Sequence, residues 1–89
     1  VKMNFGEAIK HLKTGKKLAR SGWNGKGMFL IYVAGTKDAK LTEDSAYYRA
    51  GLKEVDINPH IDMYTANGTM QPGWLASQSD LLAEDWEIV

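Results

Sequence analysis

Six consecutive apolar or aromatic residues, 28–33 (MFLIYV), constrain the fold of this chain more than any other stretch. Aromatic and β-branched residues favour strands, and a strand that is apolar on both faces has to be covered on both. A helix of the same chain can cover one face, and the second face must meet either more of this chain or another subunit. In a chain of 89 residues we expect another subunit to cover it.

A glycine-rich loop precedes this strand. Residues 21–27 (SGWNGKG) hold three glycines, a tryptophan, an amide and a cation. Glycines let backbone N–H groups approach a ligand closely, Trp23 offers a flat surface for a ring, and Lys26 brings a mobile positive charge. This combination suits a nucleotide-like ligand. The alternative is a tight turn that needs its glycines for backbone reasons, with Trp23 packed into the core.

Apolar residues at helical spacing predict an amphipathic helix over residues 4–14. Asn4 is placed to cap this helix, and Glu7 three residues later completes a capping box. Gly15 suits the left-handed position that follows a last helical turn. A short strand at residues 16–21 is expected to run into the glycine loop and to pair with the apolar strand in an antiparallel hairpin.

The pattern weakens in the middle of the chain, residues 34–58. The glycine, lysine and aspartate residues of 35–40 indicate a turn, and residues 42–49 are expected to form one or two helical turns capped by Thr42. This part of the sequence gives the fewest constraints.

A second hairpin is predicted by the alternation of polar and apolar residues over 59–65, because Asn67 and Gly68 then give a type I′ turn signal. The alternation places His60 and Asp62 on one face of the strand. There they can reach a common ligand, or they can contact each other.

A short C-terminal helix is predicted to begin after Ser77, since Asp80 three residues later again resembles a capping box. Its first N–H groups, with the Ser77 hydroxyl and the Gln78 amide, form a donor-rich site suited to ribose or phosphate oxygens. Residues 85–89 read as a final strand. The fold expected for residues 1–89 is therefore one small α+β domain, a mainly antiparallel sheet with an N-terminal helix and a short C-terminal helix.

Composition argues against several classes of function. Eleven basic and eleven acidic residues give zero net charge, so no general field favours a nucleic acid polymer. No apolar run approaches the roughly 20 residues of a membrane span, so we expect a soluble protein without membrane partners. The absence of cysteine fits a reducing cytoplasm.

Catalytic chemistry has few candidates in this sequence. There is no cysteine, and His11 and His60 are the two histidines. No nucleophile-elbow pattern surrounds Ser77, and His60 and Asp62 lack a third metal ligand at a recognisable spacing. We therefore expect no catalytic residue, no metal and no cofactor. A binding module needs stacking faces, amides and backbone donors. Beside the glycine loop, the residues that supply these are Phe5, Trp23, Asn24, Trp74 and Gln78.

Three stretches together resemble a known family of small phage proteins: residues 4–8 (NFGEA), 22–29 (GWNGKGMF) and 74–87 (WLASQSDLLAEDWE), with 59–63 (PHIDM) between them. In order, spacing and overall length the chain is similar to the second Thoeris anti-defence family, previously a domain of unknown function. The resemblance covers most of the chain and is weakest over residues 34–58.

The resemblance implies a phage-encoded sponge, meaning a protein that binds nucleotide immune signals and holds them intact, in the cytoplasm of the infected bacterial cell. It implies a homotetramer that sequesters glycocyclic ADP-ribose made by TIR enzymes, and in some members cyclic dinucleotides in separate pockets near protomer contacts. The residues it implies for the adenine- and ribose-containing site, with Trp23 stacking on the base, are Phe5, Trp23, Asn24, Ser77, Gln78 and Asp80. Those for a cyclic dinucleotide site are Gly25, Gly27, Met28 and Thr65. Asp62 and Trp74 complete the set of expected ligand-binding residues.

Two alternatives from other classes remain at this point. One is a metal-dependent cyclic-nucleotide phosphodiesterase that uses His60 and Asp62. The other is a protein-interaction inhibitor that blocks a host factor through the apolar strand at residues 28–33.

Overall fold

Helix α1 (Phe5–Lys13) forms where the apolar spacing predicts it, in a computed structural model that describes residues 1–89. The Asn4 side chain accepts a hydrogen bond of 2.9 Å from the Glu7 N–H, and the Glu7 carboxylate accepts one of 3.2 Å from the Asn4 N–H. Gly15 follows the helix with φ of 94°, a left-handed conformation that glycine adopts without strain. The predicted capping box and helix end are therefore confirmed.

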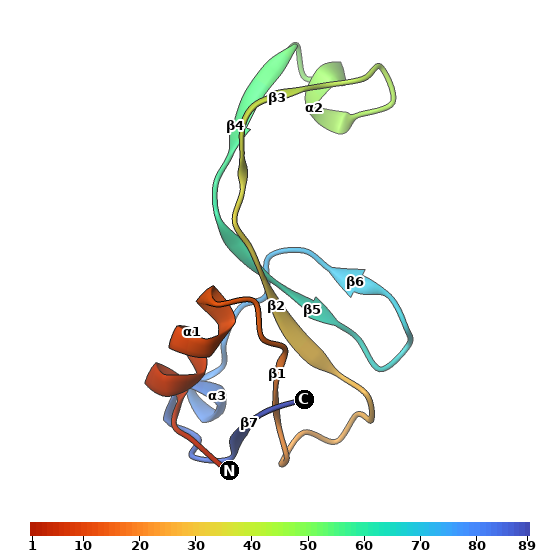
Figure 1. Ribbon diagram of the computed structural model, residues 1–89. Helices are drawn as coiled ribbons and strands as arrows, with labels where there is room; N and C mark the ends of the chain where they lie inside the picture. The colour runs from red at the N-terminus through yellow and green to blue at the C-terminus, as the bar shows by residue number, and fades with distance from the viewer.

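Five strands form one antiparallel sheet in the order β6-β5-β2-β1-β7 (Figure 1). Both predicted hairpins are present, since β1 pairs with β2 and β5 pairs with β6. Two pairings join segments far apart in the sequence: β2 with β5, and β1 with β7. The strands are β1 (Leu18–Arg20), β2 (Phe29–Val33), β5 (His60–Tyr64), β6 (Met70–Gln71) and β7 (Trp86–Ile88). The α+β fold with a mainly antiparallel sheet is thus confirmed.

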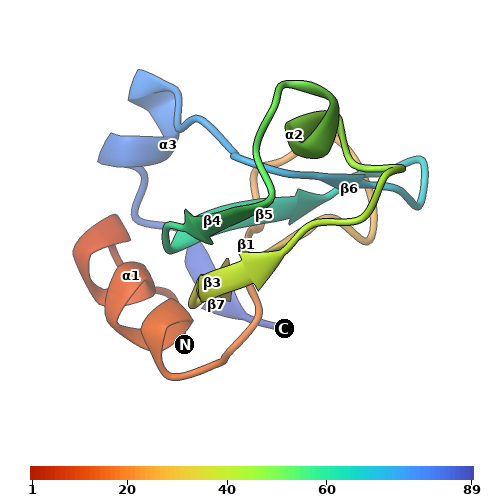
Figure 2. The same ribbon diagram turned by 90° about the horizontal axis from the view of Figure 1, so that it is seen from above.

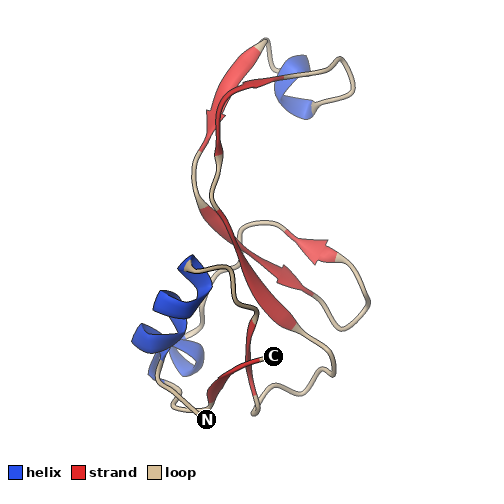
Figure 3. Ribbon diagram, in the orientation of Figure 1, coloured by secondary structure: helices blue, strands red, loops and turns tan.

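The core lies between one face of this sheet and helix α1. Helix α3 (Gln78–Leu82) packs beside α1, and both helices lie on the same side of the body (Figure 3). Ser77 caps α3 with the predicted capping box. None of the helices combines the length and the apolar character that crossing a membrane requires. The fully buried residues are Ala8, Leu12, Leu18, Leu30 and Trp86.

Residues 34–58 differ from the prediction. They form an arm made of β3 (Thr36–Lys40), helix α2 (Ala46–Arg49) and β4 (Glu54–Ile57), which projects from the body (Figure 1). The expectation of a turn over 35–40 is wrong, because this segment pairs as a strand with β4. That pairing depends on partners 14 to 21 residues later, and turn-forming residues give no local signal of it.

The cap of helix α2 also differs from the prediction. The Ser45 hydroxyl, and not Thr42, caps the helix by accepting a hydrogen bond of 3.1 Å from the Tyr47 N–H. Helix α2 lies at the tip of the arm, away from α1 and α3, and Figure 2 looks down the arm onto the body. The arm is therefore held together by the pairing of its own strands, β3 and β4, with α2 at its tip.

The turn between β5 and β6 is not the predicted type I′ turn. That type requires positive φ at both Asn67 and Gly68, but of these two residues only Gly68 has it, at 80°. The Gly68 N–H instead donates to the Thr65 carbonyl at 3.0 Å, and the Thr65 N–H donates to the Thr69 carbonyl at 2.8 Å. The loop is thus one residue longer than the two-residue form, with glycine at its left-handed position.

The second face of β2 carries an aromatic stack. Phe29 stacks on Tyr64 with ring centroids 4.9 Å apart, and the Lys17 ammonium lies 4.8 Å from the Phe29 centroid. Leu30 points the other way, into the core under α1. The helices of the body lie on the Leu30 side, so the expectation that another subunit meets the Phe29 side stays a prediction.

Candidate ligand-binding site

The glycine-rich loop borders a groove of about 540 Å³, here called the loop groove, beside β1 and β7. Four of the predicted ligand-binding residues line it: Trp23, Gly25, Gly27 and Met28. Lys26, which the sequence offered as a mobile cation, lines it as well. Four more lining residues carry charge or an aromatic ring and were not predicted as ligand contacts: Lys17, Arg20, Phe29 and Glu87.

Two lysines supply the free positive charge of the loop groove. Neither Lys17 nor Lys26 forms an ion pair with any carboxylate of the chain, and both side chains are exposed. Lys17 comes from the segment before β1 and Lys26 from the loop, so two separate elements place a cation at one groove. Ammonium groups with glycine N–H groups nearby are suited to phosphate oxygens.

Arg20 also lines the loop groove, but two carboxylates hold it. Its Nε donates to Asp85 Oδ1 at 2.9 Å, and its Nη1 donates to Asp80 Oδ1 at 2.8 Å. The same carboxylates reach the loop, because Gly22 N–H donates to Asp85 Oδ2 at 2.7 Å and Trp23 Nε1 donates to Asp80 Oδ1 at 3.1 Å. The guanidinium charge is therefore neutralised within the protein, and the root of the loop is fixed by the same contacts.

The pKa values of this cluster shift in the directions that keep all three groups charged. Hydrogen bonds to Asp85 and then Asp80 raise the pKa of Arg20. The hydrogen bond from Arg20 lowers the pKa of Asp85, against the opposing effect of burial, and the Gly22 N–H adds to the lowering. Burial by itself raises the pKa of Asp80, but hydrogen bonds from Trp23, Arg20 and Ser77 outweigh it and lower that pKa.

We expect this cluster to make the protein sensitive to acid. Asp80 and Asp85 have lower pKa values in the folded chain than their ordinary value of 3.8, so their contribution to stability is present above that pH. It is lost as the pH falls through the lower, folded values, because the unfolded chain then binds the protons more readily. Urea unfolding between pH 7 and pH 3 should show level stability down to about pH 5 and a steep fall below about pH 4. An Asp85→Asn variant should lose less stability over the same interval, and an equal loss in both proteins would contradict the assignment.

Trp23 belongs to an aromatic cluster as well as to the loop groove. Its ring packs edge-on against Trp86 at 5.3 Å and against Trp74 at 6.5 Å. Phe5 lies 5.4 Å from Trp86 and 6.2 Å from Trp74. Trp86 is fully buried, whereas the other three rings are half-buried. The two roles that the sequence offered for Trp23, a core residue and a ligand-facing ring, are therefore compatible.

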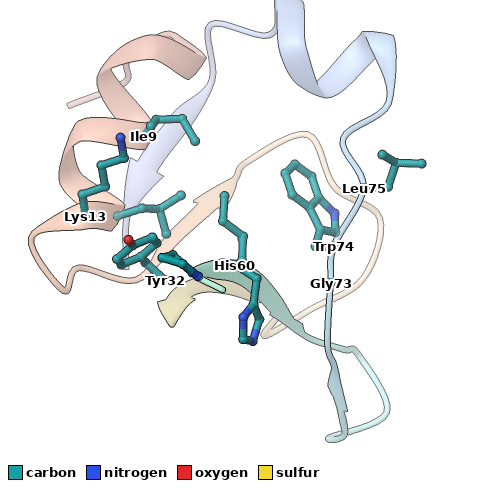
Figure 4. Close-up of a pocket in the computed structure, with 10 residues that line it drawn as sticks. Ile9, Lys13, Tyr32, His60, Gly73, Trp74 and Leu75 are labelled. Carbon is teal, nitrogen blue, oxygen red and sulfur yellow. The ribbon is translucent and has the colours of Figure 1, made fainter. Parts of the chain in front are cut away.

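A second groove of about 480 Å³, the helix groove, lies between α1, the base of the arm and residues 73–75 (Figure 4). Its lining is more apolar than that of the loop groove. Trp74 is the one predicted ligand-binding residue that lines it. Its other members include Ile9, Lys13, Tyr32, His60 and Leu75.

His60 and Asp62 contact each other at the edge of the helix groove, which is the simpler of the two interpretations that the sequence left open. The His60 Nε2 atom lies 3.4 Å from Asp62 Oδ1, and His60 Nδ1 donates to the Asn58 carbonyl at 2.8 Å. Asp62 Oδ1 also accepts a hydrogen bond of 3.0 Å from the Gly73 N–H. No group of three histidine or acidic side chains is placed to hold a metal ion.

Comparison with known proteins identifies the family of this chain. A family model described as the Thoeris anti-defense 2-like domain matches residues 3–89. This chain belongs to the Thoeris anti-defense 2-like family. A relative named "Thoeris anti-defense 2", from Bacillus phage SP01, is 41% identical over 88 residues, which cover 99% of this chain and 96% of the relative. The resemblance seen in the sequence is confirmed, and membership supports a phage anti-defence role. The family name also fits a non-catalytic role.

In this Thoeris anti-defense 2-like chain, the predicted ligand-binding residues do not all meet in one place. Asn24, Ser77 and Gln78 are exposed, and Asp80 is buried with its carboxylate engaged. Ligand contact through these residues stays a prediction. The predicted residues that line neither groove are Phe5, Asn24, Asp62, Thr65, Ser77, Gln78 and Asp80.

No sequence signal indicated that the loop groove of this Thoeris anti-defense 2-like chain is also lined by Lys17, Arg20, Phe29 and Glu87. Glu87 reaches it because β7 pairs with β1, where Ala19 and Glu87 are partners in the register. This pairing joins two segments that lie about 68 residues apart in the sequence. Hairpin signals depend on nearby turns, so no local pattern could have indicated it.

Proposed function

We propose that this protein sequesters a cyclic nucleotide immune signal without cleaving it, so that the downstream effector is not activated. The signal proposed is glycocyclic ADP-ribose made by TIR enzymes, and cyclic dinucleotides are a second class. The observation that carries the proposal is the loop groove, where Trp23, Gly25, Gly27 and two lysines that form no ion pair border one space of about 540 Å³.

The chemistry of the loop groove matches the parts of such a ligand. Lys17 and Lys26 are suited to the phosphates, and a tryptophan ring supplies about 1–3 kcal/mol when a base stacks on it. The charge is local, since the whole chain has zero net charge. A small anion therefore fits this groove better than a nucleic acid polymer, which needs a broad basic surface.

The positions of His60 and Asp62 favour holding over cleavage. A phosphodiesterase would need these side chains beside the bound phosphates. His60 instead lines the helix groove, and Asp62 contacts His60 and accepts a hydrogen bond from the Gly73 N–H. The loop groove is lined by neither of them.

We further propose that the protein acts as a homotetramer with ligand pockets near the protomer contacts. The support is the outer face of β2, where Phe29, Ile31 and Val33 are half-buried and no helix of the same chain packs. Burying such a face against a second copy would add apolar area to a small core.

Incubation with glycocyclic ADP-ribose, followed by heat denaturation, should release the ligand intact and in a fixed ratio to protein. Native mass spectrometry of the undenatured complex should report both the subunit number and the ligands held. A variant that carries both Lys17→Ala and Lys26→Ala should retain about tenfold less ligand, because each lost ammonium removes a charge-assisted contact. Recovery of a cleaved product would sink the proposal in favour of a hydrolase.

A further inference from the structure

We propose that Asp85 is a positioning residue that fixes the root of the glycine loop, so that the loop presents its N–H groups and Lys26 to the loop groove. As far as the bound ligand is concerned, this rests on the proposed function. The anchoring of the loop itself does not depend on which ligand the groove takes.

Asp85 contacts three consecutive residues at the root of the loop. Its Oδ1 accepts from Arg20 Nε at 2.9 Å, its backbone carbonyl accepts from the Ser21 N–H at 3.2 Å, and its Oδ2 accepts from the Gly22 N–H at 2.7 Å. A carboxylate that joins a guanidinium and a backbone N–H holds both more firmly than a neutral acceptor would.

Gly22 shows how closely the loop and this carboxylate approach each other. A Cβ atom added at Gly22 would lie 2.6 Å from Asp85 Oδ2, which is closer than real Cβ atoms come. The sequence motif of residues 21–27 therefore uses its first glycine for contact with Asp85, and the later ones lie at the groove. Lys26 and Gly27 follow Gly22 by four and five residues. The path of the backbone at Gly22 therefore influences where these two residues lie.

The change in ligand affinity on removal of Asp85 distinguishes a positioning role from a purely electrostatic role, because the two roles predict changes of opposite sign. Asp85 is a negative charge near a groove proposed to bind an anion, so by electrostatics alone its removal should strengthen binding. If Asp85 positions the loop, its removal should weaken binding because the N–H groups and Lys26 lose their fixed geometry. Glu87 lines the groove and forms no hydrogen bond or ion pair through its side chain, so it carries the charge without the anchoring contacts.

The test titrates glycocyclic ADP-ribose into the full chain and its variants by calorimetry. Asp85→Ala is expected to bind about tenfold more weakly, and Asp85→Asn, which keeps an acceptor for the Gly22 N–H, should recover part of that loss. Glu87→Gln should bind more tightly than the unchanged protein. Asp56→Ala removes a similar contact in the arm, from the Asp38 N–H to the Asp56 carboxylate at 2.8 Å, and should leave binding unchanged.

Amide hydrogen exchange of the ligand-free protein gives the second readout. Exchange at Gly22 should be at least about tenfold faster in Asp85→Ala, with core amides unchanged, and slower again in Asp85→Asn. Tighter binding by Asp85→Ala, or unchanged Gly22 exchange, would overturn the positioning role. If the unchanged protein fails to bind the probe while Gly22 exchange responds as expected, the loop anchor is supported and the sponge proposal falls.

Discussion

Replacement of Asp80 with alanine is expected to lower the free energy of unfolding by about 3 kcal/mol. Asp80 is 8% exposed, and its carboxylate accepts hydrogen bonds from Arg20, Trp23 and the Ser77 N–H. The substitution leaves part of a half-buried guanidinium without a partner and removes half of the α3 capping box. Breaking one side of a buried ion pair is among the most destabilising of single changes.

Urea unfolding at pH 7 measures this effect directly. The matched control is Lys40→Ala, which removes the ion pair between Lys40 and Glu54 in the arm, where the lysine side chain is 80% exposed. An exposed pair contributes less than about 1 kcal/mol, so this variant should unfold close to the unchanged protein. Equal stability losses in the two variants would show that the Asp80 cluster does not hold the body together.

Replacement of Trp23 with alanine is expected to weaken nucleotide binding by about tenfold or more, because the base loses its stacking surface. The sequence left open whether the Trp23 ring also packs into the core. The structure adds a cost in stability of about 2 kcal/mol, since the half-buried ring packs against Trp86 and its N–H donates to Asp80. Binding must therefore be measured at a temperature where unfolding curves show the variant to be fully folded.

Trp23→Phe separates the two roles of this side chain. Phenylalanine keeps a ring for stacking but loses the hydrogen bond to Asp80, so this variant should recover much of the binding and little of the stability. If Trp23→Ala binds glycocyclic ADP-ribose as tightly as the unchanged protein, the ring belongs to the core alone, and the loop returns to a structural interpretation.

Local sequence determined the elements whose signals lie within a few residues. The α1 capping box needs only Asn4 and Glu7 at the right spacing, and the α3 capping box needs only Ser77 and Asp80. The strands of the second hairpin follow from alternation before a glycine turn, and those of the first hairpin follow from strand-forming residues beside the glycine-rich loop. The turn at Asn67 was predicted in position but not in type, because type I′ and the longer bulged form share the same residues.

The arm could not be predicted from its residues. The segment after Gly35 is rich in lysine and aspartate, which favour turns in isolation, yet β3 forms because β4 supplies its hydrogen bonds from the far side of α2. Such a pairing exists only in the folded hairpin and produces no periodic pattern of polar and apolar residues in the sequence.

The features of the candidate site also divide into those set by local sequence and those set by long-range contacts. The sequence by itself determined the glycine-rich loop with Trp23 and Lys26, because the chemistry of those residue types is local. Only the tertiary structure decided that β7 pairs with β1 and that Asp80 and Asp85 converge on Arg20, contacts that span 60 and 65 residues. These long-range contacts depend on which strands pair in the sheet, and no spacing along the chain encodes that pairing.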